Sequence, residues 1–427
     1  SRSRRRRMVF KNFDETWGGF GPAPKFPSAH NLLFLMGQKD PLCMQMAEKT
    51  LVQMYRGGIF DHIGGGFCRY STDERWLVPH FEKMLYDNAW LLAAYAQAYS
   101  LTGNPFYRQV GERIFEYIEQ ELTDPEGGFW CGQDADSDGV EGKYYVFTQE
   151  EIRRILGKEE GDAFCVQYGI TANGNFEGKS IPNLLGNKDY ERICEEQFGC
   201  DGGGHMDGIG REAFQKLYEY RIRRAPLHKD DKILVSWNGW MICAFAKAGA
   251  VLGDKRYVDM AVRAEGFVRQ KLMKDGRLQV RYRDGDAAGE GKLDDYTCYI
   301  LALLELYQVT FQTAYLEQAA RCAEILLEQF FVQEKGGFYL YAEDGEQLFM
   351  RTKENYDGAM RQGILWAPGC FISWHRSQVR QNGRKRWINS CTIWPVHGRV
   401  SLRAQLCALN YDGGALSDKR TDMYAFL

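Results

Sequence analysis

Apolar residues recur along most of the chain at the spacing that places them on one face of an α-helix. Leu85, Ala89 and Leu92 begin one such stripe, because residues three and four positions apart share a helix face. Similar stripes predict further helices at about 29–38, 42–56, 148–157, 210–224, 236–252, 255–273, 294–311 and 314–331. Breakers that contain Gly or Pro separate neighbouring helices at 102–105 and 252–254. The pattern therefore predicts a succession of antiparallel helical pairs.

A repeated tripeptide marks the ends of several predicted helices. Gly-Gly-Phe occurs at 18–20, 65–67, 127–129 and 336–338, which is typical of an array of repeated helical hairpins. The aromatic segment 143–147 predicts a short β-hairpin in one of the loops. We therefore expect an all-α fold, an α/α toroid of helical hairpins with short β-hairpins in the loops. The loops at one end of this toroid would carry the polar clusters.

Charge and composition limit the classes of molecule that the protein is expected to bind. The 427 residues carry a formal net charge of -3, so no strong positive field favours nucleic acid or an anionic membrane. No run of about 18 apolar residues predicts a membrane span. The 12 cysteines include no Cys-x-x-Cys pair, which favours free thiols in a reducing cytoplasm over a zinc site. We expect a cytoplasmic protein with no metal and no cofactor, and a basic start at 1–13 outside the fold.

The densest group of charged, aromatic and imidazole side chains follows three consecutive glycines, Gly64–Gly66. An imidazole beside carboxylates suits acid–base catalysis near neutral pH. We interpret His80 as the acid–base catalyst and Asp87, at the start of a predicted helix, as a group that binds or polarises the substrate. The alternative is a capped helix end with a histidine whose hydrogen bonds are satisfied. Neighbouring candidates for substrate binding are Asp61, His62, Arg69, Glu82 and Asn88.

An acidic loop spans 133–142. It superficially resembles a calcium-binding loop, but Tyr145 stands where such a loop requires its bidentate glutamate. We therefore interpret Asp134, Asp136 and Glu141 as groups at the mouth of a cavity, where they hydrogen-bond the hydroxyls of a ligand.

Two predicted helices begin with an Asp pair, at 230–231 and at 294–295. Aromatic side chains follow each pair, and an aromatic face stacks on a sugar ring while carboxylates bind its hydroxyls. The alternative is helix capping by Ser236 and by carboxylates, which the positive end of the helix dipole favours. The catalytic candidates here are Asp231 and Asp295, and the substrate-binding candidates are Trp237, Asn238, Asp294 and Tyr296.

A family resemblance rests on five segments in this order: 18–27, 64–88, 133–142, 230–238 and 356–360. Together they resemble the spermatogenesis-associated protein twenty family, whose bacterial members are labelled thioredoxin domain-containing proteins. The resemblance implies an (α/α)6 barrel similar to N-acylglucosamine 2-epimerases and six-hairpin glycosidases. It also implies a thioredoxin-like domain with its own cysteine motif. Because this chain has no such motif, we expect a thioredoxin-like partner domain outside it.

The sequence departs from the family pattern after Met360. The family continues with Pro, a small residue and Gly-Asn-Ser-Val, whereas Arg361 begins a tail rich in Arg and Trp without helical period. Restoring one base before the codon of Arg361 can, with suitable codons, return Pro-Ala-Gly-Asn-Ser-Val. We therefore predict that 14–360 form an incomplete (α/α)6 toroid and that 361–427 are an out-of-frame tail.

The clusters and the resemblance predict a carbohydrate-active barrel of the epimerase or isomerase type. Its substrate would be a small molecule, a sugar or a sugar derivative, because epimerisation needs proton removal beside a carbonyl, which an imidazole performs. A second interpretation is a non-catalytic binding or chaperone-like partner of a thioredoxin-like domain. If the reading frame is shifted, this form of the chain is inactive. A further alternative is glycoside hydrolysis by two carboxylates among Asp87, Asp136, Asp231 and Asp295.

Overall fold

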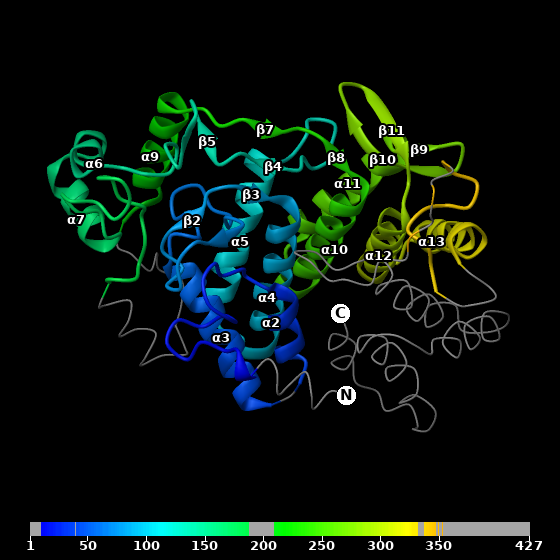
Figure 1. The fold of residues 1–427 in the computed structure, drawn as a ribbon, viewed down its shortest axis with the longest axis horizontal. Coiled ribbons are helices and arrows are strands. Elements are labelled where there is room, and N and C mark those ends of the chain that lie inside the picture. Colours follow the sequence, from blue (N-terminus) through cyan, green and yellow to red (C-terminus); the bar gives the residue numbers. More distant parts are fainter. Residues whose placement is uncertain are drawn as a thin grey trace.

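Helices make up most of the regular structure of the chain (Figure 1). The structure is a computed structural model that describes residues 10–38, 40–187, 209–331, 337–346, 349 and 352. The expected tail at 361–427 and most of the basic start lie outside the described residues. Within the described ranges, no helix combines the length and the hydropathy that crossing a membrane requires.

Four helices form an inner row. α2 (Ala29–Met36) lies beside α4 (Leu85–Thr102), and α10 (Val235–Leu252) packs between α4 and α12 (Leu293–Thr310). The last three helices have 18 residues each, and most of their side chains are buried. Helices that are apolar on nearly every face are suited to the interior of a protein. These helices therefore form the inner layer of the toroid.

An outer helix follows each inner helix. Between α4 and α5, Gly103 adopts a left-handed conformation, and the side chain of Asn104 accepts a hydrogen bond from Phe106 N at 3.0 Å. Gly253 and Asp254 form the same turn and cap before α11. The helical pairs predicted from the breakers are thus confirmed. The outer helices are α3 (Pro41–Arg56), α5 (Pro105–Glu121), α11 (Lys255–Lys271) and α13 (Thr313–Ile325), which continues into the π-helical turn Leu326–Phe330.

The Gly-Gly-Phe repeat forms one kind of turn after successive outer helices. In the copies that end at Phe67, Phe129 and Phe338, the residue after the phenylalanine donates its N–H back to a carbonyl at or just beyond the helix end. The repeated hairpin predicted from the tripeptide is therefore confirmed, and one copy, at 272–279, forms without it. The bonds join Cys68 N to Ile59 O, Trp130 N to Leu122 O and Gln279 N to Leu272 O at 2.8 Å, and Tyr339 N to Phe330 O at 2.9 Å.

An asparagine in the next inner helix holds two of these turns. Asn88 Oδ1 accepts a hydrogen bond from Phe67 N at 2.8 Å, and Asn88 Nδ2 donates to Phe67 O at 3.0 Å. Asn238 makes the equivalent bonds with Phe129 at 2.8 and 2.9 Å. Both asparagines are fully buried fourth residues of their helices. We therefore assign them a structural role in place of the expected contact with substrate.

Short strands gather at the end of the helical layers where the inner helices begin (Figure 1). β3 and β8 lead directly into α4 and α10, so this end carries the polar loops. One antiparallel sheet has the order β3 (Lys83–Met84), β4 (Gly132–Gln133) and β7 (Lys229–Asp230). β10 (Arg277–Arg283) pairs with β8 (Ile233–Leu234), β9 (Met273–Lys274) and β11 (Asp286–Glu290). Two further pairs are β1 (Tyr70–Ser71) with β2 (Pro79–His80), and β5 (Asp136–Ser137) with β6 (Val140–Glu141).

The β-hairpin expected over 143–147 does not form. Phe147 makes only a single bridge, to Ser180, and Tyr144 and Tyr145 lie in a turn with both rings buried. The guanidinium of Arg221 lies 4.3 Å and 5.7 Å from the two ring centroids. The aromatic pattern therefore reflects cation–π packing against a distant helix and not a strand.

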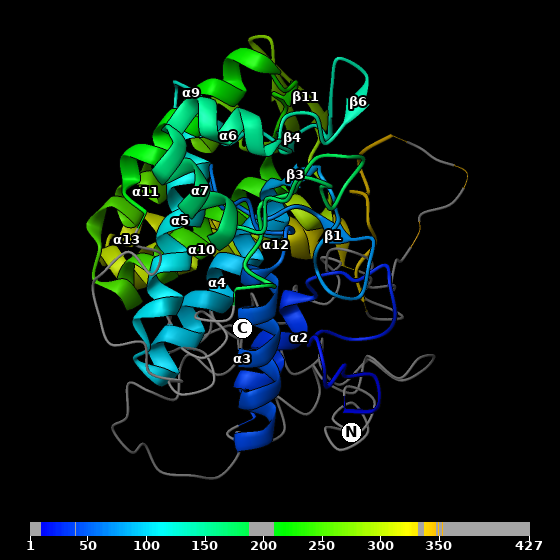
Figure 2. The same ribbon diagram turned by 90° about the vertical axis from the view of Figure 1, so that its left-hand side faces the viewer.

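Three helices cover one side of the helical pairs. α6 (Gln149–Leu156), α7 (Lys158–Gln167) and α9 (Arg211–Arg224) lie next to α5 (Figures 1 and 2). Tyr218 of α9 donates a hydrogen bond to Glu121 at the end of α5. This contact attaches the side group to the toroid.

Candidate active site

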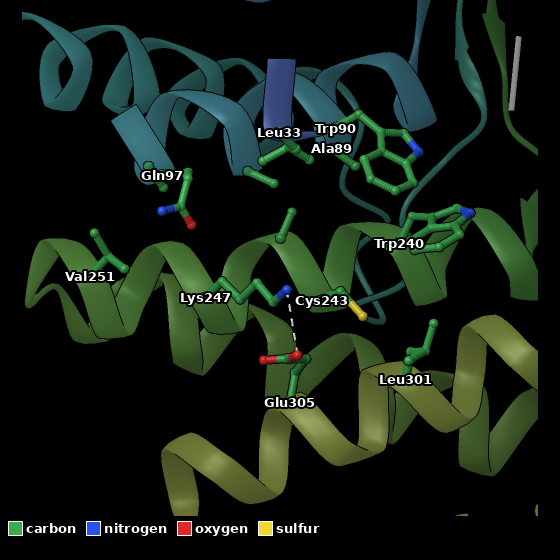
Figure 3. A pocket seen from close by; sticks show the side chains of 13 residues that line it. Leu33, Ala89, Trp90, Gln97, Trp240, Cys243, Lys247, Val251, Leu301 and Glu305 are labelled. Carbon is green, nitrogen blue, oxygen red and sulfur yellow. Dashed lines mark ion pairs between the residues drawn. The ribbon is translucent and has the colours of Figure 1, made fainter. Parts of the chain in front are cut away.

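The inner helices line a cavity with an aromatic wall (Figure 3). Trp90 and Trp240 occupy the same position, the sixth residue, in α4 and α10. Their ring centroids are 4.6 Å apart. Most of the other lining residues are Ala, Leu or Val from α2, α4, α10 and α12. The two indoles pack against each other, with Trp240 buried and Trp90 half-buried, and form an aromatic part of an otherwise mostly apolar wall.

A polar layer lines the same cavity farther along the inner helices. Gln97, Lys247 and Glu305 each stand at the thirteenth position of their helices, α4, α10 and α12. Lys247 Nζ lies 3.5 Å from Glu305 Oε1 (Figure 3). The apolar pattern of the sequence does not single out these residues. Aligning the three 18-residue helices on their first positions would have brought them together.

The first turns of the inner helices lie beyond the tryptophan end of the cavity lining. Asp87 and Trp237 are the third residues of α4 and α10. They precede Trp90 and Trp240 by three positions, so each lies on the face of its tryptophan, one turn nearer the start of its helix. Tyr86 packs edge-on against Trp237, with the ring centroids 4.8 Å apart. The first turns of α4 and α10 therefore meet at Tyr86 and Trp237, with Asp87 next to Tyr86 in sequence.

His80 is the centre of a charged group, of which Arg69 and Glu82 influence the pKa of Asp87. Its Nδ1 lies 2.9 Å from Glu141 Oε1, and its Nε2 lies 3.7 Å from Glu82 Oε2. Arg69 Nη1 donates a hydrogen bond to Glu82 at 3.1 Å. The imidazole stacks on Tyr70, its partner across the β1–β2 pair, with the centroids 5.1 Å apart. The carboxylate acceptor at Nδ1 favours a proton there, which leaves Nε2 of the neutral ring able to accept one.

Asp87 is a half-buried residue whose carboxyl group has a raised pKa. Burial raises the pKa of Asp87 well above its usual value; Arg69 opposes this shift and the charge of Glu82 adds to it. Its Oδ2 is buried and makes no hydrogen bond with any described residue. A buried polar atom without a partner costs stability. Such an atom is expected where the missing partner is a ligand.

Asp295 joins the first turns of two inner helices. Its Oδ1 accepts a hydrogen bond from Ser236 N at 3.2 Å, and its Oδ2 accepts one from Lys292 N at 2.9 Å. Burial raises the pKa of Asp295 to about 7, and the charge of Asp294 contributes. Tyr296 is buried, and its hydroxyl accepts a backbone hydrogen bond from β10. Asp295 and Tyr296 are thus engaged in holding helix α12.

The acidic loop meets the charged group through one residue. Asp134 and Asp136 are exposed. The β5–β6 hairpin turns through Asp138 and Gly139, both with positive φ, as its two-residue turn requires. This turn places Glu141 at the end of β6, where it reaches His80.

Asp231 is engaged in an ion pair outside the cavity lining. Its Oδ1 lies 2.8 Å from Nε of Arg283 in β10. Asp230, beside it, pairs with Lys232 at 2.9 Å. Across the part of the chain that the structure describes, no three His, Cys, Asp or Glu side chains come together as a group that could hold a metal ion.

Asp61 and His62, both expected to bind substrate, are buried in the core. Arg221 donates hydrogen bonds to both carboxylate oxygens of Asp61 at 2.9 and 2.8 Å, and Lys83 donates another at 2.8 Å. Burial would raise the pKa of Asp61, but the two cations hold it far below its usual range. His62 contacts three aromatic rings, and burial lowers the pKa of His62 to about 4. We therefore remove both residues from the substrate-binding set.

Solved structures of carbohydrate enzymes share this fold. A D-mannose isomerase superposes with a TM-score of 0.60 at 11% identity, over 92% of this chain and 83% of that one. A GH76 α-mannanase from Bacteroides thetaiotaomicron gives a TM-score of 0.52 at 10% identity, over 91% and 80% of the two chains. At these identities the likeness shows the fold alone. The chain is a toroid of the (α/α)6 type.

Similarity in sequence indicates the relationship of this chain to known proteins more specifically than the shared fold does. The chain is 34% identical to spermatogenesis-associated protein 20 of Homo sapiens over 422 residues, 89% of this chain. An uncharacterized protein of Caenorhabditis elegans is 32% identical over 386 residues, 82% of this chain. No protein-family model matches. The chain is therefore a homologue of spermatogenesis-associated protein 20 over most of its length, and it spans about half the length of these relatives, 53% and 52%.

Proposed function

We propose that the group of His80, Glu82 and Asp87 before and in the first turn of α4 is the active site of a sugar isomerase or epimerase, which moves a proton on the carbon beside a carbonyl. The observation that carries the proposal is Asp87, whose Oδ2 is buried and unpartnered among the described residues and whose pKa is raised. A protonated acid near an imidazole base supplies the two groups that enolisation needs. The tryptophan wall and the carbohydrate enzymes that share the fold support a sugar as the substrate.

Each group has a distinct part in the proton transfer. Nε2 of His80 takes the proton from carbon while the carboxyl of Asp87 gives its proton to the carbonyl oxygen, which leaves an enediol. Glu141 stabilises the imidazolium through Nδ1–H, and Arg69 stabilises the carboxylate that forms at Asp87. Delivery of a proton to the opposite face of the same carbon, with return of the carbonyl-oxygen proton to Asp87, gives the epimer. Return to the former carbonyl carbon, with loss of the other hydroxyl proton, gives the isomer.

Glycoside hydrolysis is the second candidate. The charge of Glu82 contributes to the raised pKa of Asp87, and a protonated acid with an ionised carboxylate is the pair that a glycosidase uses. Asp231 and Asp295 suit this role less, because an arginine and backbone N–H groups already engage their oxygens. We rank the hydrolase second because it leaves His80 without a part.

Two wider expectations from the sequence stay proposals. A thioredoxin-like partner is proposed from the family resemblance alone. A cytoplasmic location fits the cysteines, because those whose thiol state the structure describes are free and buried.

The test is proton exchange at carbon. The full chain is incubated in D2O with neutral aldoses and ketoses, including D-mannose, D-glucose and D-fructose, and the proton at C2 or C1 is followed by NMR. We expect deuterium incorporation and a new sugar, both lost in His80→Gln and Asp87→Asn while the circular dichroism spectrum is kept. Release of reducing ends from glycosides without exchange would favour the hydrolase. Neither reaction in a folded protein would reject both candidates.

A further inference from the structure

Three rings from separate segments of the chain form one row that ends at His80. The ring centroids of Phe26 and Tyr70 are 4.9 Å apart, with 32° between the ring planes. Those of Tyr70 and His80 are 5.1 Å apart, with 25° between the planes. Ring pairs at such distances attract each other beyond the area that they bury. Phe26 belongs to the segment 18–27, a motif of the sequence to which the proposed function gives no part.

Backbone pairing places the three rings on one face. Lys25 and Ser71 exchange two backbone hydrogen bonds, both of 2.8 Å, so the chain at Lys25 adds a third segment to the β1–β2 pair. Successive residues of an extended chain point to opposite faces. Phe26, Tyr70 and His80 therefore lie on the outer face, where Phe26 is 42% exposed. The residues of the opposite, buried face are Lys25, Ser71 and Pro79.

A buried lysine fixes the added segment. Lys25 is 1% exposed, and its Nζ donates a hydrogen bond to Asp14 Oδ2. The same ammonium donates to the carbonyl oxygens of Gly18 and Glu74 at 2.9 and 2.8 Å. All three donors of the ammonium are thus in use. Phe26, the next residue, packs against Tyr70 from a backbone that is held in place.

The charges around His80 meet its edge, whereas Tyr70 covers a face of the ring. Nδ1 lies 2.9 Å from Glu141 Oε1 of β6, and Nε2 lies 3.7 Å from Glu82 Oε2, which precedes β3. Arg69 Nη1 lies 3.1 Å from the same oxygen of Glu82. An aromatic face attracts a cation. The contact with Tyr70 therefore stabilises the imidazolium relative to the neutral ring.

We propose that Tyr70, with Phe26 packed behind it, is a positioning residue for His80. Its ring sets the plane of the imidazole, and it stabilises the imidazolium that forms when Nε2 takes a proton. The segment 18–27 then contributes to the site through Phe26. The part of this contact in turnover rests on the proposed function, whereas its effect on the imidazole does not.

NMR of the histidine rings tests the inference without turnover. In the full chain labelled with 15N-histidine, His80→Gln identifies the signals of His80 among the seven histidines. We expect Tyr70→Leu to remove the upfield ring-current shift of the His80 ring protons. The same change should lower the midpoint of their pH titration by about 0.5 unit, the effect of one cation–π contact at a partly exposed site. Tyr70→Phe should keep both properties, and Phe26→Leu should change them less than Tyr70→Leu does.

The matched control is Phe13→Leu. Phe13 also lies in the first part of the chain, is half-buried and contacts one aromatic ring, that of Phe20, at 5.9 Å between the centroids. A purely structural role of the row predicts that Phe13→Leu and Phe26→Leu both leave the His80 signals unchanged. We expect Phe26→Leu alone to shift them. In the proton-exchange assay, Tyr70→Leu should lower kcat about threefold, which corresponds to 0.5 unit, and leave KM unchanged.

The outcomes separate this inference from the proposed function. Unchanged His80 signals in folded Tyr70→Leu and Phe26→Leu proteins would overturn the positioning role, whatever the rate of proton exchange. If Tyr70→Leu does not fold, Phe26→Leu, at an exposed position, decides the question by the same signals. A shifted titration in a protein that exchanges no carbon-bound proton would keep the positioning role and reject the isomerase.

Discussion

Nδ1 of His80 lies 2.9 Å from Oε1 of Glu141, although 61 residues separate them. The β1–β2 pair holds the histidine, and the β5–β6 hairpin carries the glutamate. Neither element belongs to the helical layers. The charged group is therefore assembled by two loops above the inner helices, and its geometry depends on both.

Glu141 is expected to position His80. Glu141→Ala should lower kcat about tenfold, since it removes a charge-assisted hydrogen bond from the imidazole. Glu141→Gln should restore much of this loss, because its carbonyl oxygen still accepts from Nδ1–H. Val140→Ala, at an exposed position of the same hairpin, is the control and should retain full activity. If the Gln variant is as impaired as the Ala variant, the role is not positioning.

Gly65 and Gly66, the second and third residues of the run Gly64–Gly66, are expected to be needed for folding and not for chemistry. Gly66 has φ +75°, and a Cβ there would lie 2.4 Å from the ring of Tyr117, whereas Gly139 has φ +74° and no atom within 4 Å. Gly139→Ala should cost about 1–2 kcal/mol of backbone strain. Gly66→Ala should cost about 3 kcal/mol or more, because overpacking adds to the same strain. Urea unfolding measures both, and equal costs would contradict the packing argument.

Asp61 is expected to matter for stability and not for binding. Asp61→Asn leaves Arg221 and Lys83 buried without their anion, so the free energy of unfolding should fall by about 3–5 kcal/mol. Asp259→Asn breaks an exposed ion pair with Lys255. This substitution should lower the free energy of unfolding by less than about 1 kcal/mol. A stable Asp61→Asn protein with weakened sugar binding would return this residue to the site.

Asp295 is expected to make stability fall as the pH rises. Its pKa is about 7 in the folded protein against an ordinary value of 3.8, so the folded state holds the proton to higher pH than the unfolded state. The stabilising contribution is complete below about pH 4 and is lost as the pH approaches 7. Relative to the wild type, Asp295→Asn should gain about 2 kcal/mol between pH 5 and 7, at about 1.4 kcal/mol per pKa unit. Parallel pH profiles of unfolding free energy for the two proteins would refute this.

The reading frame after Met360 can be examined directly. Resequencing the gene at the codons of Met360 and Arg361 should reveal one missing base, and the repaired frame should read Pro-Ala-Gly-Asn-Ser-Val. An intact frame that encodes Arg361 and the residues after it, found again in related genes, would reject the shift.

Much of the fold follows from local pattern. The periodicity around Leu85 and the breakers at 102–105 and 252–254 predict helices within one or two residues of α4, α10 and α12. This works because burial of one helix face and the turn preferences of Gly and Pro act over a few residues. The same logic fails at Tyr144 and Tyr145, where a guanidinium from α9 determines the conformation.

In the candidate site, too, some relationships between residues follow from the sequence and others only from the tertiary structure. Sequence alone determined that His80, Glu82 and Asp87 belong to one cluster, because they lie within eight residues. Only the tertiary structure decided that Arg221, 160 residues away, donates hydrogen bonds to the carboxylate of Asp61. It also decided that Glu141 is the hydrogen-bond partner of His80. The polar layer of Gln97, Lys247 and Glu305 likewise exists only when three helices pack side by side. Helix formation is a local property of the chain, whereas burial, pKa and the partner of a charge depend on which distant segments the fold brings into contact.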